Sequence, residues 1–518
     1  MIKKIIVVTV IALLAMGTVW SEGQSEKKGA EDRTVTIWEA LQGVATISVS
    51  SLDETPLYKE YQDRVGIDAT WIHPVEGQER EQLGIMIAGG DLPDIMYTDW
   101  AANYPGGYAK AAEDGVLSVL NDLIKTSAPY FKKLMGENPE WDRAIKTDAG
   151  DYTVFPFIRG HESLMVFFGP MLRADWMNEL GLEVPETIDE WDTVLKALKE
   201  AKGVALNMTS LSGGGRQLRT GPAFISAYDI TLDWFIDKEG KVQYGQYTTA
   251  YKDAIATLAK WYAEGLIDPE FVTNDRKVFD SKNLNNQAAA WIGYGGSTMG
   301  AYLTNKKDDP SFDLVGAKYP VLNKGDKPFS GQMDVPFRGT SAGITGNSKK
   351  KELAAEFLDY AYSDEGHILM NFGIEGESFE WVDGYPLYTD LINNNPDGLT
   401  MAQALCLYVR SSYSGPIIQD KRYIEQYYKT DQQKTAWEEW SYTDAAKHKY
   451  PTVTRTSAEN DEWADIMSEV KTYADEMYAR FITGSASLDD FDDYLATLKS
   501  MGIERAIEIQ TAAYQRYL

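Results

Sequence analysis

The stretch IAGGDLPDIMYTDW, residues 87–100, decides how we interpret the fold of this chain. Gly89 and Gly90 suit the left-handed C-cap of a helix, and Pro93 cannot continue a helix, so the preceding helix is predicted to end here. Residues 93–97, PDIMY, are then predicted to form a buried strand. The stretch therefore predicts a helix, a turn and a strand in direct succession.

Two side chains at the mouth of this strand suggest a function. Asp99 and Trp100 follow the apolar residues directly. An enzyme would use the Asp for chemistry, whereas a binding protein would use both side chains to hold a ligand. The rest of the sequence has to decide between these two interpretations.

Strands and helices alternate around this stretch. Residues 34–38, TVTIW, alternate between polar and apolar positions, and residues 65–73, VGIDATWIH, form a second β-rich run. A short helix is predicted between them, over residues 58–64. This alternation is typical of an α/β protein whose mainly parallel sheet is covered by helices.

Longer helices are predicted further along the chain. In residues 185–201, Thr187 and Glu190 form a capping box and Trp191 begins an apolar stripe at helical spacing. Two more helices are predicted within residues 250–271 and 349–366, and the C-terminal part of the chain is predicted to be helical.

The charge and the cysteine content exclude several classes of function. A formal net charge of −28 argues against a nucleic-acid or anionic-membrane surface, because both need clustered Lys and Arg. Cys406 is the single cysteine, so no intrachain disulfide can form and a Cys-rich zinc site is excluded.

The N-terminal residues are predicted to be a secretion signal. Lys3 and Lys4 precede an apolar run that is too short to span a bilayer, which takes about 20 residues. We predict a signal peptide over residues 1–21, cleaved near Ser21, and a disordered leader over residues 22–33. No Cys follows the apolar run, so no lipid anchor is expected, and the predicted location is the periplasm.

No motif for metal binding or covalent catalysis is complete. Residues 393–398, NNNPDG, begin like a calcium loop, but Ala404 stands where a bidentate Glu is needed, so a turn is favoured. YGGSTMG, residues 294–300, does not match G-x-S-x-G, and the glycine-rich residues 211–221 lack the Lys of a Walker loop. Paired carboxylates for glycoside cleavage remain open, because no spacing singles out one pair among 78 acidic residues. We expect no cofactor and no metal.

Aromatic residues beside polar groups favour carbohydrate binding. Sugars stack their C–H faces on aromatic rings and pair their hydroxyls with planar polar side chains. The chain has 14 Trp and 31 Tyr, and several of them follow predicted strands or lie in loops, as Asp99-Trp100 does. The ends of strands in an open α/β sheet are where ligands bind.

The order of several stretches resembles a known family. VTIW (35–38), residues 58–71, residues 87–100 and GGYAKAAEDGVLSVLNDLI (106–124) resemble the first lobe of extracellular solute-binding proteins that serve carbohydrate ABC importers. Residues 151–199 resemble the first crossing into their second lobe, and FRGTSAGITGNSKKKELAAEFLDYAYSDEG (337–366) resembles a return crossing like that of maltose-binding proteins. Residues 371–389 and 481–518 are similar to the larger, oligosaccharide-binding branch.

The resemblance implies two α/β lobes joined by hinge strands, each lobe built on a mainly parallel sheet. It places residues 34–157 and 343–400 in the N-terminal lobe and residues 162–338 and 405–518 in the C-terminal lobe. Hinges are expected near residues 158–162, 338–343 and 400–410. The calcium loop that this branch often carries is absent from the matching residues 199–210, KEAKGVALNMTS, so calcium binding stays open.

The resemblance also implies ligand-binding residues, from the ends of strands, the first hinge and aromatic positions. These are Glu39, Gln42, Asp99, Trp100, Asn103, Arg159, His161, Glu162, Trp291, Tyr294, Trp437 and Trp440. From their position before the second crossing we add Asp334 and Arg338. For Arg159, His161 and Asp334 a hinge salt bridge or a capping role is an equal alternative.

The predicted function is therefore capture of an oligosaccharide and its delivery to an ABC permease, by a monomer that is not an enzyme and binds no nucleic acid. A secreted glycoside hydrolase or lyase is one alternative, and a binding protein for another solute such as a peptide is a second. The identity of the sugar stays open, because Arg159, Arg216, Arg219 and Arg338 could form a local basic pocket for uronates despite the acidic composition.

Overall fold

The structure is a computed structural model that describes residues 32–41, 49–75, 78–208, 220–337, 340–410 and 415–518. Gln42, Arg338, the signal peptide and most of the predicted leader lie outside these residues, as does most of the glycine-rich segment 211–221. None of the helices in the described ranges combines the length and the apolarity that a membrane span requires.

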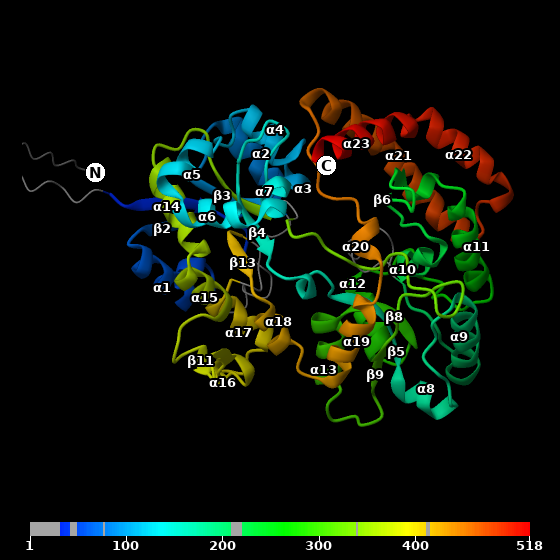
Figure 1. Ribbon diagram of the computed structural model, residues 1–518. Helices are drawn as coiled ribbons and strands as arrows, with labels where there is room; N and C mark the ends of the chain where they lie inside the picture. The colour runs from blue at the N-terminus through cyan, green and yellow to red at the C-terminus, as the bar shows by residue number, and fades with distance from the viewer. Residues whose placement is uncertain (1–31, 42–48, 76–77, 209–219, 338–339, 411–414) are drawn as a thin grey trace, which may run out of the picture. The chain divides into compact units, whose positions relative to one another are not determined.

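A six-stranded sheet forms the centre of the first lobe (Figure 1). β1 is parallel to both β2 and β3, as the alternation of strands and helices predicted. β10 is inserted antiparallel between β3 and β4, and β13 is parallel to β4. The strands are β1 (Thr34–Trp38), β2 (Asp68–Ile72), β3 (Ile95–Asp99), β4 (Phe155–Arg159), β10 (Thr340–Ile344) and β13 (Ile417–Gln419).

Helices bury the apolar residues of this sheet in one hydrophobic core. They are α1 (Pro56–Val65), α2 (Glu79–Gly89), α3 (Trp100–Asn103), α4 (Gly107–Glu113), α5 (Asn121–Ser127), α6 (Pro129–Glu137), α7 (Pro139–Ile145), α14 (Lys351–Asp359) and α15 (Asp364–Phe372). A small separate core joins β11 (Phe379–Val382), β12 (Tyr385–Tyr388), α16 (Asp390–Asn393), α17 (Met401–Tyr408) and α18 (Lys421–Tyr427).

The position of β13 differs from the division of the chain that we predicted. We placed residues 405–518 in the second lobe, but Ile417 pairs with Phe157 of β4 and is buried in the core of the first lobe (Figure 1). Asn371 of α15 also donates to the carbonyl of Ile418 at 2.9 Å. Residues 401–408, within an expected hinge, form α17, because their apolar side chains have a core to fill.

The second lobe has a smaller sheet in the order β8 (Ala290–Tyr294), β5 (Phe168–Arg173), β9 (Leu314–Gly316). β5 is antiparallel to both neighbours, and parallel pairing is limited to single bridges, such as Leu206 with Ala290. This sheet is therefore mixed rather than mainly parallel. A hairpin of β6 (Trp234–Ile236) and β7 (Val242–Tyr244) lies outside it.

Most of the second lobe is helical, and its largest core is built from helices that come from distant parts of the chain. The helices are α8 (Ala174–Leu180), α9 (Ile188–Lys202), α10 (Thr220–Ile225), α11 (Ala250–Ala263), α12 (Arg276–Leu284), α13 (Ala301–Asn305), α19 (Asp431–Ser441), α20 (Ala445–His448), α21 (Ser457–Thr483), α22 (Phe491–Ser500) and α23 (Ile503–Tyr517).

The local signals that we used to place helix ends are confirmed. The capping box before α9 forms, with the Glu190 amide donating to Thr187 Oγ1 at 3.1 Å and the Thr187 amide donating to the Glu190 carboxylate. α2 ends at Gly89, and Gly90 takes the left-handed conformation with φ 71°. Both ends are set by residues within one or two turns of the chain.

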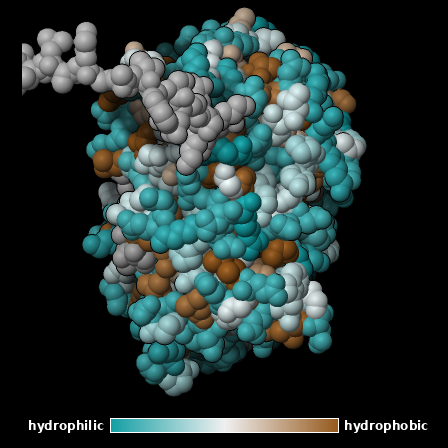
Figure 2. All heavy atoms as spheres, turned by 90° about the vertical axis from the view of Figure 1, so that its left-hand side faces the viewer, coloured by the Kyte–Doolittle hydropathy of each residue, from teal (hydrophilic) through white to brown (hydrophobic). Residues whose placement is uncertain are grey.

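Three of the tryptophans that we interpreted as sugar platforms are core residues. Trp100, Trp291 and Trp440 are each 0% exposed. Trp100 lies in the core of the first lobe, and the other two lie in a second core of the second lobe. Their rings have no face open to a ligand, so this part of our prediction is wrong. Exposed apolar side chains are scattered on the face in Figure 2, which is mostly hydrophilic.

Trp440 reaches its position because glycines let α19 approach the second sheet. A Cβ on Gly169 would lie 2.3 Å from the Trp440 ring, and one on Gly316 would lie 2.4 Å from the Ala436 Cβ. The Trp440 Nε1–H donates to the Pro170 carbonyl at 2.9 Å. Because these two strand positions carry no side chain, α19 can pack directly against the second sheet.

Gly169→Ala is expected to destabilise the protein by about 1–3 kcal/mol, because the new methyl group overpacks a fixed ring. Gly84→Ala is the matched control, since a Cβ there meets nothing within 4 Å and alanine is favoured inside a helix. Urea unfolding of both variants measures the difference. Equal stability of the two variants would contradict this packing.

Asp359 joins two helices of the first lobe that are far apart in sequence. Its carboxylate, at the end of α14, accepts hydrogen bonds from the amides of Tyr130 at 3.1 Å and Phe131 at 2.7 Å, in the first turn of α6. The residue is 2% exposed. Burial raises the pKa of Asp359 to about 6, against the two hydrogen bonds that favour the charged form.

This raised pKa predicts a pH dependence of stability. The folded state holds the proton more tightly than the unfolded state, so the contribution of Asp359 to stability is complete below its unfolded pKa and is lost as pH rises through about 6. The free energy of unfolding of the wild type should therefore fall, relative to Asp359→Asn, between pH 4 and pH 6.5. A constant difference across this range would show that the group does not titrate there.

Candidate ligand-binding site

Polar side chains collect at the carboxyl edge of the first sheet. The ends of β1 and β3 and the start of β10 line a cavity of about 290 Å³, which we call the sheet-edge pocket. Its lining includes Glu39, Asp99, Asn103, Thr98 and Ser341. Parallel strands end together at this edge, which is where open α/β sheets bind ligands.

Asp99 and Asn103 are held in place by short local contacts. Asp99 is the N-cap of α3, and its Oδ1 accepts from the Ala102 amide at 3.1 Å. The Asn103 side-chain amide donates to Thr98 Oγ1 at 2.7 Å. Both side chains are half-buried, so the pocket presents oriented carboxylate and amide groups, which suit sugar hydroxyls.

A buried ion pair stands behind the sheet-edge pocket. Arg410 Nη2 donates to Glu39 Oε1, and the two residues are 1% and 5% exposed. The guanidinium also lies 5.2 Å from the centre of the Tyr97 ring. Burial raises the pKa of the Glu39 carboxyl, and the charge of Arg410 opposes that rise. The pair fixes the end of β1 against the end of α17.

Arg159 joins the connections between the lobes. Its Nε donates to Asp334 Oδ2 at 2.8 Å and its Nη1 to Gln419 Oε1 at 2.9 Å. Its guanidinium also lies 5.0 Å from the centre of the Phe167 ring. The ends of β4 and β13 and the segment before β10 therefore meet at one side chain. We call Arg159, Asp334 and Gln419 the hinge cluster.

An aromatic cluster begins the second lobe next to the hinge cluster. The Phe167 and Tyr294 rings are stacked at 6.0 Å with an angle of 8°, and Phe168 meets Tyr294 edge-on at 5.3 Å. Gln332 Oε1 accepts from the Phe167 amide at 2.7 Å. Tyr294 and Phe168 come from paired strand ends, β8 and β5. All three aromatic residues are half-buried.

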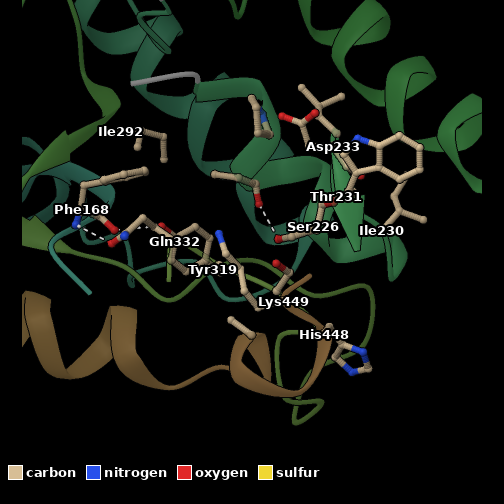
Figure 3. A pocket seen from close by; sticks show the side chains of 17 residues that line it. Phe168, Ser226, Ile230, Thr231, Asp233, Ile292, Tyr319, Gln332, His448 and Lys449 are labelled. Atoms are coloured by element: carbon tan, nitrogen blue, oxygen red, sulfur yellow. Dashed lines mark hydrogen bonds between the residues drawn. The ribbon is translucent and has the colours of Figure 1, made fainter. Parts of the chain in front are cut away.

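A second cavity, of about 220 Å³, adjoins this aromatic cluster in the second lobe (Figure 3). Phe168, Tyr319 and Gln332 lie on one side of it, and Asp233 lies on the other. The Tyr319 hydroxyl donates to the Phe168 carbonyl at 2.9 Å, which fixes the ring. Each lobe thus has its own pocket with aromatic or apolar walls and a few polar groups.

The other predicted residues have local roles. The imidazole of His161 caps the short helix 162–164 by accepting from the Ser163 amide at 3.1 Å, and Glu162 is exposed in that helix. Trp437 is half-buried and donates to the Ser163 carbonyl at 3.1 Å. The first hinge therefore carries capping groups, as the alternative interpretation of His161 held.

Several site residues escaped the sequence analysis. Phe167 and Phe168 directly follow the first crossing, and two adjacent aromatic residues at this position could have been recognised as candidate ligand contacts. Arg410, Gln332 and Gln419 had no local signal, because their partners lie far away in the chain. These three residues were not predicted because of the distance along the chain to their partners, and not because of their residue types.

The calcium-like motif NNNPDG is a turn, as the sequence favoured. The Asp397 amide donates to Asn395 Oδ1 at 2.9 Å, and the Asn393 side chain donates to the Tyr388 carbonyl at 2.7 Å. Gly398 has φ 76°. Within the described ranges, no group of three or more His, Cys, Asp or Glu side chains is placed to hold a metal ion.

Two α/β lobes, joined by strands that meet at one edge and each carrying a pocket, define the two-lobed class of solute-binding proteins. The chain belongs to the bacterial extracellular solute-binding protein family, whose model matches residues 50–368.

Known relatives agree over most of the chain. Lipoprotein LipO of Bacillus subtilis is 25% identical over 439 residues, covering 82% of this chain and 81% of that protein. The fructooligosaccharide ABC transporter substrate-binding protein FusA of Streptococcus pneumoniae is 24% identical over 506 residues, covering 91% and 88%. The crystal structure of the alginate-binding protein AlgQ2 superposes with a TM-score of 0.75 at 23% identity, covering 94% of this chain and 99% of that one.

The Glu39–Arg410 pair should show strong energetic coupling. Arg410→Gln is expected to cost about 3–5 kcal/mol of stability, because it leaves a buried carboxylate without its cation. The double variant with Glu39→Gln should recover part of this loss, which a double-mutant cycle by urea unfolding measures. The exposed pair of Arg505 and Glu462, 2.8 Å apart, is the control and should couple far more weakly. Equal coupling in both cycles would contradict the role of burial.

Proposed function

We propose that this protein is the substrate-binding component of an ABC importer and that it captures an oligosaccharide between its two lobes. The observation that carries the proposal is the pairing of two surfaces around the hinge cluster. The sheet-edge pocket offers carboxylate and amide groups, and the cluster of Phe167, Phe168 and Tyr294 offers half-buried aromatic rings. Hydroxyls and C–H faces of a sugar need these two kinds of group.

The relatives support a saccharide as ligand. FusA is named for fructooligosaccharides, AlgQ2 binds alginate, and YtcQ of Bacillus subtilis is a polygalacturonan- and rhamnogalacturonan-binding protein. A solute-binding protein from Bifidobacterium longum infantis, described as binding HMO, superposes with a TM-score of 0.76 at 18% identity. These ligands include neutral and acidic saccharides.

The proposed mechanism is a shift between open and closed arrangements of the lobes. A ligand that contacts both lobes stabilises the arrangement in which both sets of contacts are made. The connections at the hinge cluster carry the change. The closed complex is then recognised by the membrane permease, which a separate ATPase drives.

We further propose that the protein acts as a monomer in the periplasm. The N-terminal residues 1–21 have the composition of a signal peptide and no lipidation Cys, which supports cleavage near Ser21 and release without a lipid anchor. The same proposal holds that bound oligosaccharide is not cleaved. Release of reducing ends during prolonged incubation with bound sugar would identify a hydrolase instead.

Asp99→Asn tests the sheet-edge pocket without disturbing the fold. Asn caps helices as well as Asp does, so α3 keeps its N-cap bond, but one acceptor oxygen is replaced by a donor. We expect the dissociation constant for the best oligosaccharide in a thermal-shift screen to rise about 10- to 100-fold, the value of one hydrogen bond to a charged group. Isothermal titration calorimetry provides the measurement.

Asp275→Asn is the matched control. Asp275 caps α12 in the same way, accepting from the Val278 amide at 2.8 Å, and lines neither pocket. Its variant should bind like the wild type. Unchanged affinity in Asp99→Asn, or equal losses in both variants, would remove Asp99 from the binding site.

A further inference from the structure

A third cavity, of about 310 Å³, lies between α2, the turn from α3 to α4, and the segment that leads into α21. We call it the arginine pocket, because Arg80 and Arg455 line it together with Trp463, Tyr108 and Asn460. None of the residues that line it is an Asp or a Glu. In a chain with a net charge of −28, a cavity with two arginines and no carboxylate is unexpected.

Arg455 has only neutral hydrogen-bond acceptors among the described residues. Its Nε and Nη2 donate to Asn460 Oδ1 at 3.3 and 3.2 Å, and its Nη1 donates to Gln510 Oε1 at 3.2 Å. A guanidinium has five N–H groups, so two remain beyond these three bonds. One face of the guanidinium is covered by the Trp463 ring, whose centre is 3.9 Å away.

Arg516 differs from Arg455 because its hydrogen-bond acceptors are carboxylates. Arg516 donates to Asp148 at 2.7 Å and also to both carboxylate oxygens of Glu459. Those two carboxylates also act on Arg455 through space, but both are ion-paired with Arg516. Among the residues that the structure describes, Arg455 is thus a partly buried cation with no directly bonded anion, and burial lowers its pKa. A cation in this position gains from an anion that brings its own acceptor oxygens.

The arginine pocket and the sheet-edge pocket are both lined by residues of α3 or its caps. α3 begins directly after Asp99, and Ala102 and Tyr104, which line the arginine pocket, belong to α3 and its C-cap. Asp99 and Asn103, which line the sheet-edge pocket, belong to the N-cap and the last residue of the same helix. Trp463, which is half-buried, provides an aromatic ring beside the guanidinium, and the guanidinium provides a fork for two oxygens.

We propose that the arginine pocket receives the carboxylate of an acidic sugar unit, so that the ligand is a uronate-containing oligosaccharide. This inference rests on the proposed function and narrows its substrate class. The carboxylate would take the two remaining N–H groups of Arg455, and Arg80, exposed on α2, would add a second positive charge. A neutral sugar would leave the cation of Arg455 without an anion.

The test compares acidic and neutral probes of equal length. Trigalacturonate and trimannuronate are titrated against galactotriose and mannotriose by isothermal titration calorimetry. We expect an acidic trisaccharide to bind at least 10-fold more tightly than its neutral counterpart. Arg455→Gln should remove about 10- to 100-fold of the acidic affinity and lower the neutral affinity far less, because the charge-assisted pair forms only with a carboxylate. Arg505→Gln, the same change at an exposed site on α23, should alter neither.

Two further measurements keep the test decisive if Arg455→Gln does not fold. Arg80→Gln, at an exposed position, should weaken acidic binding and reduce its dependence on salt. Trp463→Phe should lose the fluorescence change that accompanies acidic binding, since the indole lies against Arg455. Sodium acetate and sodium sulfate are added as competitors, to test whether a free anion alone occupies the pocket.

The outcomes separate the two proposals. Tight neutral binding without any acidic preference overturns this inference and leaves the proposed function intact. Acidic binding that is unaffected in all three pocket variants also overturns it, as does competition by acetate or sulfate at the concentration of the saccharide, which would indicate a simple anion site. If no saccharide binds at all, the proposed function fails, and this inference falls with it.

Discussion

Arg159 occupies the point on which the arrangement of the connections depends. It bonds Asp334, 175 residues later in the chain, and Gln419, 260 residues later, so three passages of the chain are held by one guanidinium. Because the same side chain lies over Phe167, the polar edge of the first sheet and the aromatic cluster of the second lobe are linked at one place. A ligand that touches both surfaces therefore acts directly on the hinge cluster.

Close packing decides which aromatic residues can meet a ligand. Two strand glycines leave room for Trp440 in the second lobe, and Trp100 and Trp291 are buried in the cores. The half-buried rings of Phe167 and Tyr294 stand at strand ends beside the hinge, where the sheet stops and a core can no longer form around them. Trp100, Trp291 and Trp440 thus contribute to the cores rather than to a ligand surface.

Arg410, Arg455 and Arg516 also fall into two groups: two arginines that are paired with carboxylates, and Arg455, which is bonded to amides. The buried pair of Glu39 and Arg410 holds an end of β1, and Arg516 is ion-paired with the carboxylates of Asp148 and Glu459. Arg455 differs, since its bonds go to amides and its charge faces a cavity. Under the proposed function and the further inference, the recognition of an anion falls to Arg455 and the recognition of hydroxyls to the sheet-edge pocket.

The sequence by itself determined the features that depend on neighbouring residues. The capping box of Thr187, the helix end at Gly90 and the parallel pairing of the first three strands follow from contacts within a few turns and from the alternation of elements. The position of Asp99 and Asn103 at the edge of the sheet was also predictable, because the end of a strand is a local feature. Tertiary structure alone decided the burial of Trp100, Trp291 and Trp440, the place of β13 and the partner of Arg410. Each of these depends on segments that are more than 100 residues apart, and no short pattern records whether a side chain meets a core, a charge or solvent.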